Sequence, residues 1–334
     1  MEAIVTKELR SRMRGARAFV VITIFLALLS CFVVALYGFT KITTGNVGGP
    51  PPPLGRIMFY TLTGIELLLI APLAPAFSAG AIAGEKERQT FDLMVITPVT
   101  PTSIVLGKVL ANLAYIALLI VVALPIQVLS ITLGGLTLTE VMVGLWILLL
   151  AAVFYGCVSV FFSSFLRSTT LASVFSYLVV ALNLIGAIFI VLILGILGFD
   201  NTLAAMLGPT SEAPSKFLLY VSDLLIAFSP VLTAIVSETA LVANGDLFLI
   251  HLDLANPNTQ GRFTMSLPSP WIIYSVIYIV LSVVCVWLSI RNVRPVVARN
   301  PRNPSRPEGY TLTETMEDVP LTQGDQRGAA EGEV

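Results

Sequence analysis

The chain has 334 residues, of which 56% are hydrophobic and 12% are charged, and its formal net charge is −1. A soluble domain carries about 25% charged residues, so this composition excludes a soluble globular protein and indicates a chain that lipid solvates. A net charge this close to zero argues neither for nor against an anionic partner, and the basic residues give no support for nucleic-acid binding.

The first segment, residues 1–17, combines an apolar face with a basic stripe. On a helical wheel the basic residues lie beside the apolar ones: Lys7, Arg10, Arg14 and Arg17 next to Val5, Leu9, Met13 and Ala16. This pattern predicts an amphipathic helix in the cytoplasmic interface, where it contacts membrane lipids. A plain topology signal is the alternative. The apolar run that follows has no cleavage site and predicts a retained anchor.

Six apolar stretches are long enough to cross a bilayer, which takes roughly 20 helical residues. They cover residues 18–40, 57–83, 109–139, 141–166, 168–199 and 270–290. The last stretch carries Trp271 and Trp287 near its ends, and tryptophan prefers the lipid–water interface. The sequence therefore predicts an all-α membrane protein with six transmembrane helices, in one transmembrane domain over residues 18–295.

The basic residues predict the orientation of these helices. With six spans, 15 of the 19 lysine and arginine residues fall on one side, which the positive-inside rule assigns to the cytoplasm. Both termini are then cytoplasmic, and we expect the cell membrane of a prokaryote. A seventh span over 217–237 would place the cluster from Arg291 to Arg306 outside. Because Asp223 and Ser229-Pro230 interrupt that stretch, we expect two short re-entrant or interfacial helices at the outer face instead.

Two more segments lie outside the spans. Residues 200–268 form an external segment that is rich in acidic residues and holds the one histidine, His251. A solvated loop explains these acidic residues better than a cation site, and His251 belongs to no metal-binding motif, so we expect no metal. Residues 296–334 contain several prolines and almost no aromatic residues, which predicts a disordered cytoplasmic tail.

Polar side chains inside the spans are candidates for a translocation path, because they are costly in lipid and usually face the interior of a bundle. The candidates are Glu66, Asn112, Gln127 and Asn183. Glu66 is the most unusual, since a carboxylate in mid-membrane is expensive. In one interpretation Glu66 faces the substrate, either as a neutral carboxyl group or in a hydrated cavity. In the other, which we favour, it lies near the outer interface or bonds to a neighbouring helix.

The segment between the second and third spans is the most informative. Its charged run, from Glu85 to Asp92, is followed by apolar residues and by Pro98, which disfavours helix in the preceding residue. Thr100-Pro101 then fits an N-cap with proline at the first helical position of the third membrane helix. A short helix held between two membrane helices suits a lever that a cytoplasmic partner moves. An ordinary solvated loop is the alternative.

This segment resembles the signature region of ABC-2 type transporter permeases. The matching motifs follow in order: Gly84-Glu85-Lys86-Glu87, Thr90-Phe91-Asp92-Leu93-Met94, Thr97-Pro98-Val99 and Gly107-Lys108. The opening Lys7-Glu8-Leu9-Arg10 also resembles the N-terminal helix of the family. One departure is Gln89, where the family frequently has glycine. The likeness covers residues 1–295 in architecture, but its specific part is confined to 84–108.

The resemblance implies a permease subunit. Two copies, in a homodimer or heterodimer, would surround a translocation path, and a separate cytoplasmic ATPase subunit would dock on the short helix, known as the coupling helix. The residues that the resemblance assigns to this docking are Glu85, Lys86, Glu87, Arg88, Thr90, Phe91, Met94, Thr97 and Pro98. ATP-driven closure of the ATPase pair would then export a substrate.

Several motifs of catalytic chains are missing from the sequence. Gly107-Lys108 is followed by Val109 and lacks the upstream glycine of a phosphate-binding loop, so ATP and Mg²⁺ would bind to the partner. No G-x-S-x-G or H-E-x-x-H motif is present, and we expect no catalytic residue and no cofactor in this chain. The alternative functions are a stand-alone channel or secondary carrier, which would call for internal repeats and conspicuous intramembrane charges, and a membrane scaffold without transport.

Overall fold

The computed structural model describes Thr6 and residues 16–44, 54–90, 100–196, 216–255 and 262–298. Six of its helices are long and apolar enough to cross a membrane. They are α2 (Ala16–Thr44), α3 (Leu54–Ser78), α6 (Pro101–Thr132), α7 (Leu138–Phe165), α8 (Thr169–Ile196) and α12 (Pro270–Ala298). The predicted helical fold with six membrane spans is therefore confirmed. The predicted interfacial helix over residues 1–17 and the C-terminal tail fall largely outside the described residues.

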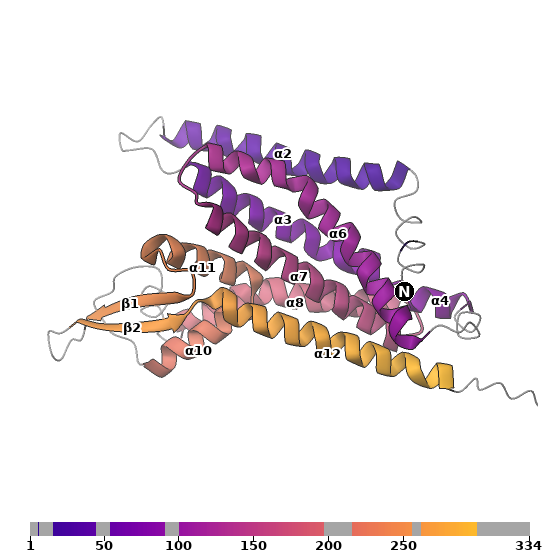
Figure 1. The fold of residues 1–334 in the computed structure, drawn as a ribbon. Coiled ribbons are helices and arrows are strands. Elements are labelled where there is room, and N and C mark those ends of the chain that lie inside the picture. Colours follow the sequence, from indigo (N-terminus) through magenta and orange to yellow (C-terminus); the bar gives the residue numbers. More distant parts are fainter. Residues whose placement is uncertain are drawn as a thin grey trace, which may run out of the picture.

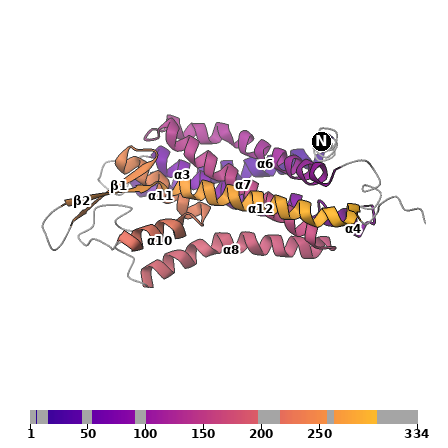
Figure 2. The ribbon, with the colours of Figure 1, turned by 60° about the horizontal axis from the view of Figure 1, so that its bottom comes forward.

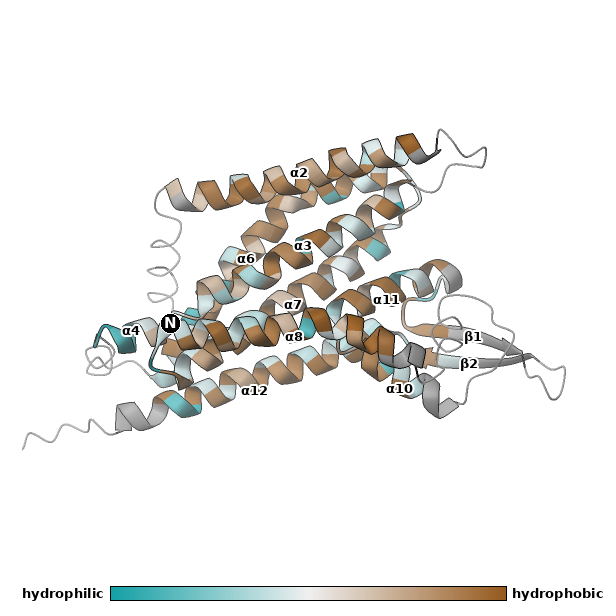
Figure 3. Ribbon diagram, turned by 180° about the vertical axis from the view of Figure 1, so that it is seen from behind, coloured by the Kyte–Doolittle hydropathy of each residue, from teal (hydrophilic) through white to brown (hydrophobic). Residues whose placement is uncertain are grey.

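Helix α7 forms the centre of the bundle. In its most apolar window 72% of the residues are buried, against 11% for α2 at the edge. It contacts α3, α6, α8 and α12, and its Tyr155 lies in the main apolar core with Tyr274 and Tyr278 of α12. Because lipid is as apolar as these side chains, van der Waals packing rather than removal from water favours their association. Apolar residues cover the spans, as the colouring of Figure 3 shows.

The start of α3 lies directly against the end of α6. A Cβ atom at Gly55 would lie 2.3 Å from the carbonyl oxygens of both Ser130 and Gly134. Only a residue without a side chain fits this approach, which explains the glycine at this position.

The third membrane helix begins where Thr100-Pro101 predicted it. The Thr100 hydroxyl accepts a hydrogen bond from the Ser103 N–H at 3.3 Å, and Pro101 is the first residue of α6. The helix thus starts eight residues before the uncharged stretch 109–139, and it carries Lys108 inside the bundle with 3% of its surface exposed.

Residues 217–237 do not form one membrane-spanning helix. They are divided between α10 (Lys216–Ile226) and α11 (Pro230–Asn244), and Ser229 caps α11 by accepting from the Leu232 N–H. At 1.5 Å per residue, each helix is shorter than the apolar core of a bilayer, which is about 30 Å thick. This division at Pro230 agrees with the prediction of two short helices, and α11 packs against α3, α7, α8 and α12.

A β-hairpin follows these helices and was not predicted. Strand β1 (Leu249–Ala255) pairs antiparallel with β2 (Arg262–Pro268), and Ile250 lies opposite Leu267. The sequence carried its signal, because Ile250, Leu252 and Leu254 alternate with polar residues. The hairpin lies at one end of the bundle, and the short helix α4 (Ala83–Glu87) lies at the other (Figure 1).

Candidate functional site

The segment that carries the specific motif lies at the end of the bundle opposite the hairpin. Helix α3 ends at Ser78, a turn follows, and α4 covers only Ala83–Glu87. A short helix is therefore present at the start of the segment, but it ends at Glu87, whereas the charged run predicted a helix that continues toward Pro98. The candidate docking residues Phe91, Met94, Thr97 and Pro98 lie outside the described residues.

The side chain of Ser163 holds the start of α4 against α7. Its Oγ accepts hydrogen bonds from the backbone N–H groups of Ile82 and Ala83, each at 2.8 Å, and Ser163 is fully buried. The first N–H groups of a helix have no partner inside the helix, so this hydroxyl satisfies two of them at once. The Lys86 Nζ also donates to the backbone carbonyl of Ser164. Two adjacent serines near the end of α7 thus bind both ends of α4.

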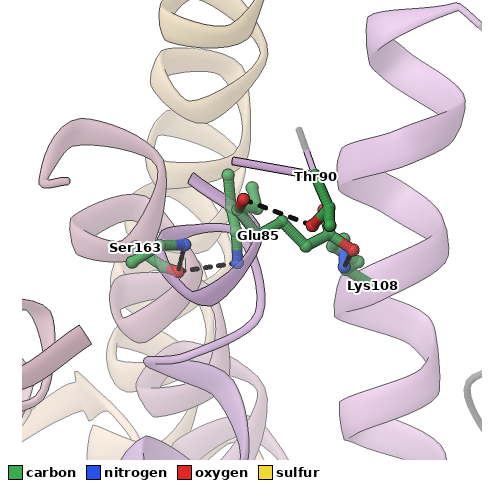
Figure 4. A network of polar contacts seen from close by, with 6 residues as sticks. Glu85, Thr90, Lys108 and Ser163 are labelled. Atoms are coloured by element: carbon green, nitrogen blue, oxygen red, sulfur yellow. Dashed lines mark hydrogen bonds and ion pairs between the residues drawn. The ribbon is translucent and has the colours of Figure 1, made fainter. Parts of the chain in front are cut away.

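A partly buried ion pair connects α4 to α6. The Lys108 Nζ lies 2.8 Å from the Glu85 Oε1. Figure 4 shows the two side chains pointing toward each other. The side chain of Lys108 is 3% exposed and that of Glu85 is 24% exposed. Breaking a buried pair on one side leaves an uncompensated charge, which is strongly destabilising. The pair joins the first and last motifs of the signature region, which are 23 residues apart in sequence.

Glu87 connects α4 to the start of α8. Its Oε2 accepts from the Thr169 hydroxyl at 2.7 Å and from the Thr169 N–H at 3.2 Å. Thr169 is the first residue of α8, and a carboxylate at a helix N-terminus interacts favourably with the helix dipole. Helix α4 is therefore bonded to three different membrane helices, α6, α7 and α8.

The C-terminal end of α4 closes as a Schellman motif. The Thr90 N–H donates to the Glu85 carbonyl at 3.0 Å, and the Gln89 N–H donates to the Lys86 carbonyl at 3.2 Å. Such an end requires a left-handed residue at the position after the cap, and Gln89 has a φ of 57°. The side chains of Arg88 and Thr90 on either side are exposed.

The four candidate path residues do not form one site. Glu66 and Gln127 do come together: the Gln127 Nε2 donates to the Glu66 Oε2 between α3 and α6, and Glu66 is 1% exposed. Asn112 is buried in α6, and its amide has no hydrogen-bond partner among the described residues. The interpretation of Glu66 as a group that bonds a neighbouring helix fits this geometry.

Asn183 lies in a separate polar cluster. Its Oδ1 accepts from the Tyr155 hydroxyl at 2.7 Å, and its Nδ2 donates to the Phe228 carbonyl at 3.1 Å. The Tyr278 hydroxyl donates to the same carbonyl at 3.1 Å. Because Phe228 stands in the break between α10 and α11, the cluster binds that break to α8 and α12.

Sequence reasoning missed several residues of these contacts. They are Ser163, Ser164, Thr169, Tyr155 and Tyr278. A pair of serines at the end of an apolar span, and a threonine two residues after the following arginine, were visible in the sequence. Their partners lie about 80 residues away, however, and no local pattern connects them.

The chain is similar to one known family over most of its length. The sequence model of a family described as ABC-2 family transporter protein matches residues 2–290. The match includes every described helix from α2 to α11 and both strands of the hairpin. A comparison with curated proteins found no match.

Proposed function

Because this chain belongs to the ABC-2 family of transporter proteins, we propose that it is the membrane-spanning permease subunit of an ATP-driven exporter. In this proposal residues 18–295 are the transmembrane domain, and two copies, identical or different, surround the translocation path. The chain has no catalytic role of its own, since a separate cytoplasmic ATPase subunit binds ATP and Mg²⁺. Both termini lie in the cytoplasm of a prokaryotic cell.

The observation that carries this proposal is the attachment of α4 to three membrane helices. Glu85 bonds to α6, the N–H groups at the start of α4 bond to α7, and Glu87 bonds to α8. A displacement of α4 would therefore act on all three helices together. This attachment supports a coupling helix more than an ordinary solvated loop, whose charges would be free to move in water.

The candidate docking residues divide into two groups by their contacts. Glu85, Lys86 and Glu87 use their side chains in bonds within the chain. Arg88 is exposed instead, at the end of α4. We assign the first group to the transmission of movement. We assign the contact with the ATPase to Arg88 and to the candidates that follow it, from Thr90 to Pro98.

Copurification of the full chain from native membranes tests the proposal. We expect a stoichiometric partner that carries a phosphate-binding glycine loop. Arg88→Glu should reduce the amount of this partner several-fold, whereas Arg291→Glu, a matched reversal at an exposed arginine of α12, should not. A chain that transports substrate after purification without any ATPase would overturn the proposal.

A further inference from the structure

Three charged side chains come together at the end of the bundle that holds the hairpin. Arg56 stands near the start of α3, Glu140 near the start of α7, and Glu238 in α11. The Arg56 Nε lies 3.8 Å from the Glu140 Oε2, and the Glu140 Oε1 accepts from the Thr137 hydroxyl at 3.1 Å. Arg56 therefore pairs with Glu140.

Among the described residues, Glu238 has no such ion-pair partner. It is 2% exposed, and neither of its carboxyl oxygens has a hydrogen-bond partner among the described residues. With two carboxyl groups and one guanidinium, the cluster lacks one positive charge when both carboxyls are ionised. A buried carboxylate is costly without a counter-charge, so this site favours either a proton or a cation on Glu238.

Glu238 borders a cavity between α3, α7 and α11. The cavity has a volume of about 80 Å³ and is open on one side. Apolar side chains form most of its wall, among them Phe59, Leu67, Ile147, Leu148, Val231 and Ala234. The polar groups at the wall besides Glu238 are Tyr60 and Thr63. Of the residues that line the cavity, Gly64 and Ile235 are exposed, so the opening lies between α3 and α11.

A glycine in α7 makes the room that Glu238 occupies. A Cβ atom at Gly144 would lie 2.9 Å from the ring of Phe59 and 3.4 Å from the Glu238 Oε1. The missing side chain therefore lets the carboxyl group approach α7 beside an apolar wall. A mostly apolar wall with a few convergent polar groups is a feature that this cavity shares with small-molecule sites.

We propose that this cavity, the Glu238 cavity, binds a hydrophobic monocation: an ammonium nitrogen at the Glu238 carboxylate, with its first carbon atoms among the apolar side chains. The ligand supplies the one positive charge that the cluster lacks, and its remaining chain leaves through the opening between α3 and α11. An ethanolamine lipid fits poorly, because its phosphate would follow the ammonium toward Glu238 and Glu140. We therefore commit to a soluble alkylamine. The proposal concerns binding to this chain and holds whether or not an ATPase drives transport.

Proton release gives a second signature of this binding. Burial, and then the nearby Glu140, raise the pKa of Glu238 to about 9, while Arg56 opposes this increase. The charged and titratable groups around it are Arg56, Glu140 and Tyr60. At neutral pH the empty cavity then holds a neutral carboxyl group, and binding of a cation displaces its proton. Affinity should increase as the pH rises from about 6 to 8.

The test uses the full chain in phosphatidylcholine nanodiscs and n-hexylammonium as the probe. We expect saturable binding by calorimetry, with 1-hexanol and hexanoate binding about tenfold more weakly or worse, because neither supplies a positive charge. Glu238→Gln keeps the shape of the side chain and should weaken hexylammonium binding by about tenfold or more. Equal binding of hexanol and hexylammonium to the wild type, or an unchanged affinity in Glu238→Gln, would overturn the proposal.

Two glycine variants test the position of the site without touching a charge. A Cβ atom at Gly64 or at Gly38 of α2 would meet no atom within 4 Å, so both positions accept leucine. Gly64→Leu should close the opening and abolish binding, whereas Gly38→Leu should bind as the wild type does. Normal binding by Gly64→Leu would place the ligand elsewhere and contradict the proposal. The same hexylammonium titration is repeated in nanodiscs that contain phosphatidylethanolamine. Weaker hexylammonium binding there would show that this lipid competes for the cavity and that our choice of a soluble amine is wrong.

Discussion

At residue 89 the backbone has a conformation that glycine adopts most easily. Gln89 has a φ of 57°, in the left-handed region, where a side chain crowds the neighbouring carbonyl oxygen. ABC-2 permeases frequently have glycine at this position, and the Schellman end of α4 explains why. The one departure from the resemblance therefore marks a point of backbone strain.

We expect Gln89→Gly to stabilise the end of α4 by about 0.5–1 kcal/mol, because relief of the left-handed conformation exceeds the entropy that glycine loses on folding. Gln89→Val should destabilise it, since β-branched residues tolerate a positive φ least. Hydrogen exchange at the Thr90 amide, which bonds across this turn, measures the change. Slower exchange in Gln89→Val than in Gln89→Gly would contradict this explanation.

The pair formed by Glu66 and Gln127 makes a second prediction for single residues. Gln127→Leu removes the donor and leaves the Glu66 carboxyl buried without a partner, which should cost about 1–3 kcal/mol of stability. Glu66→Gln keeps a hydrogen-bonding side chain of the same shape and should change stability much less. Thermal unfolding of both variants in the same detergent checks the order. If Glu66 also lines the translocation path, Glu66→Gln will lower export at normal expression.

At the scale of the elements, one hydroxyl group, that of Ser163, links the start of α4 to α7. Ser163→Ala would leave the N–H groups of Ile82 and Ala83 without their acceptor. We expect it to uncouple ATP hydrolysis by the partner from transport, while the permease still reaches the membrane. Ser159→Ala is the matched control, because Ser159 lies one helical turn earlier, is equally buried, and donates to the Tyr155 carbonyl within α7, its one side-chain bond among the described residues. Equal effects of the two variants would rule out a special role for Ser163.

Local sequence signals predicted the elements whose ends are encoded in neighbouring residues. Thr100-Pro101 and Ser229-Pro230 each place a capping hydroxyl before a proline, and both helices begin there. The contacts of α4 could not be predicted in this way. The predicted span starts at residue 109, directly after Lys108, because nothing near Lys108 in sequence indicates that Glu85 compensates its charge inside the bundle. The charge of Glu238 is likewise visible in the sequence, but its cavity requires α3, α7 and α11 to be placed together.

At the scale of the whole molecule, two buried carboxyl groups make stability depend on pH. Burial raises the pKa of Asp223 from 3.8 to about 7 and that of Glu238 from 4.5 to about 9. The folded chain then binds more protons than the unfolded chain over this range. The free energy of unfolding therefore falls as the pH rises from about 4 to 9.

We expect the midpoint of thermal unfolding to decrease steadily between pH 5 and 9 in detergent. Glu238→Gln should make this decrease shallower, most clearly between pH 7 and 9, where Glu238 still releases its proton and Asp223 is largely titrated. Asp223→Asn should instead flatten the curve below pH 7. A wild-type midpoint that rises over the same interval would contradict the sign of both contributions.

In addition to its packing against α7, helix α8 is held by hydrogen bonds at two positions along its length. Its first residue bonds to Glu87, and Asn183 bonds to the Phe228 carbonyl in the break between α10 and α11. Figure 2 shows α8 running unbroken along one side of the bundle between α4 and α10. The 14 residues between these bonds correspond to about 21 Å at 1.5 Å per residue. With its pivot at Thr169, a tilt of about 5° would displace Asn183 by about 2 Å, which is enough to break a hydrogen bond. A rotation that barely changes the packing around α4 would thus detach the α10–α11 break from α8 and leave its Phe228 carbonyl bonded to Tyr278 of α12.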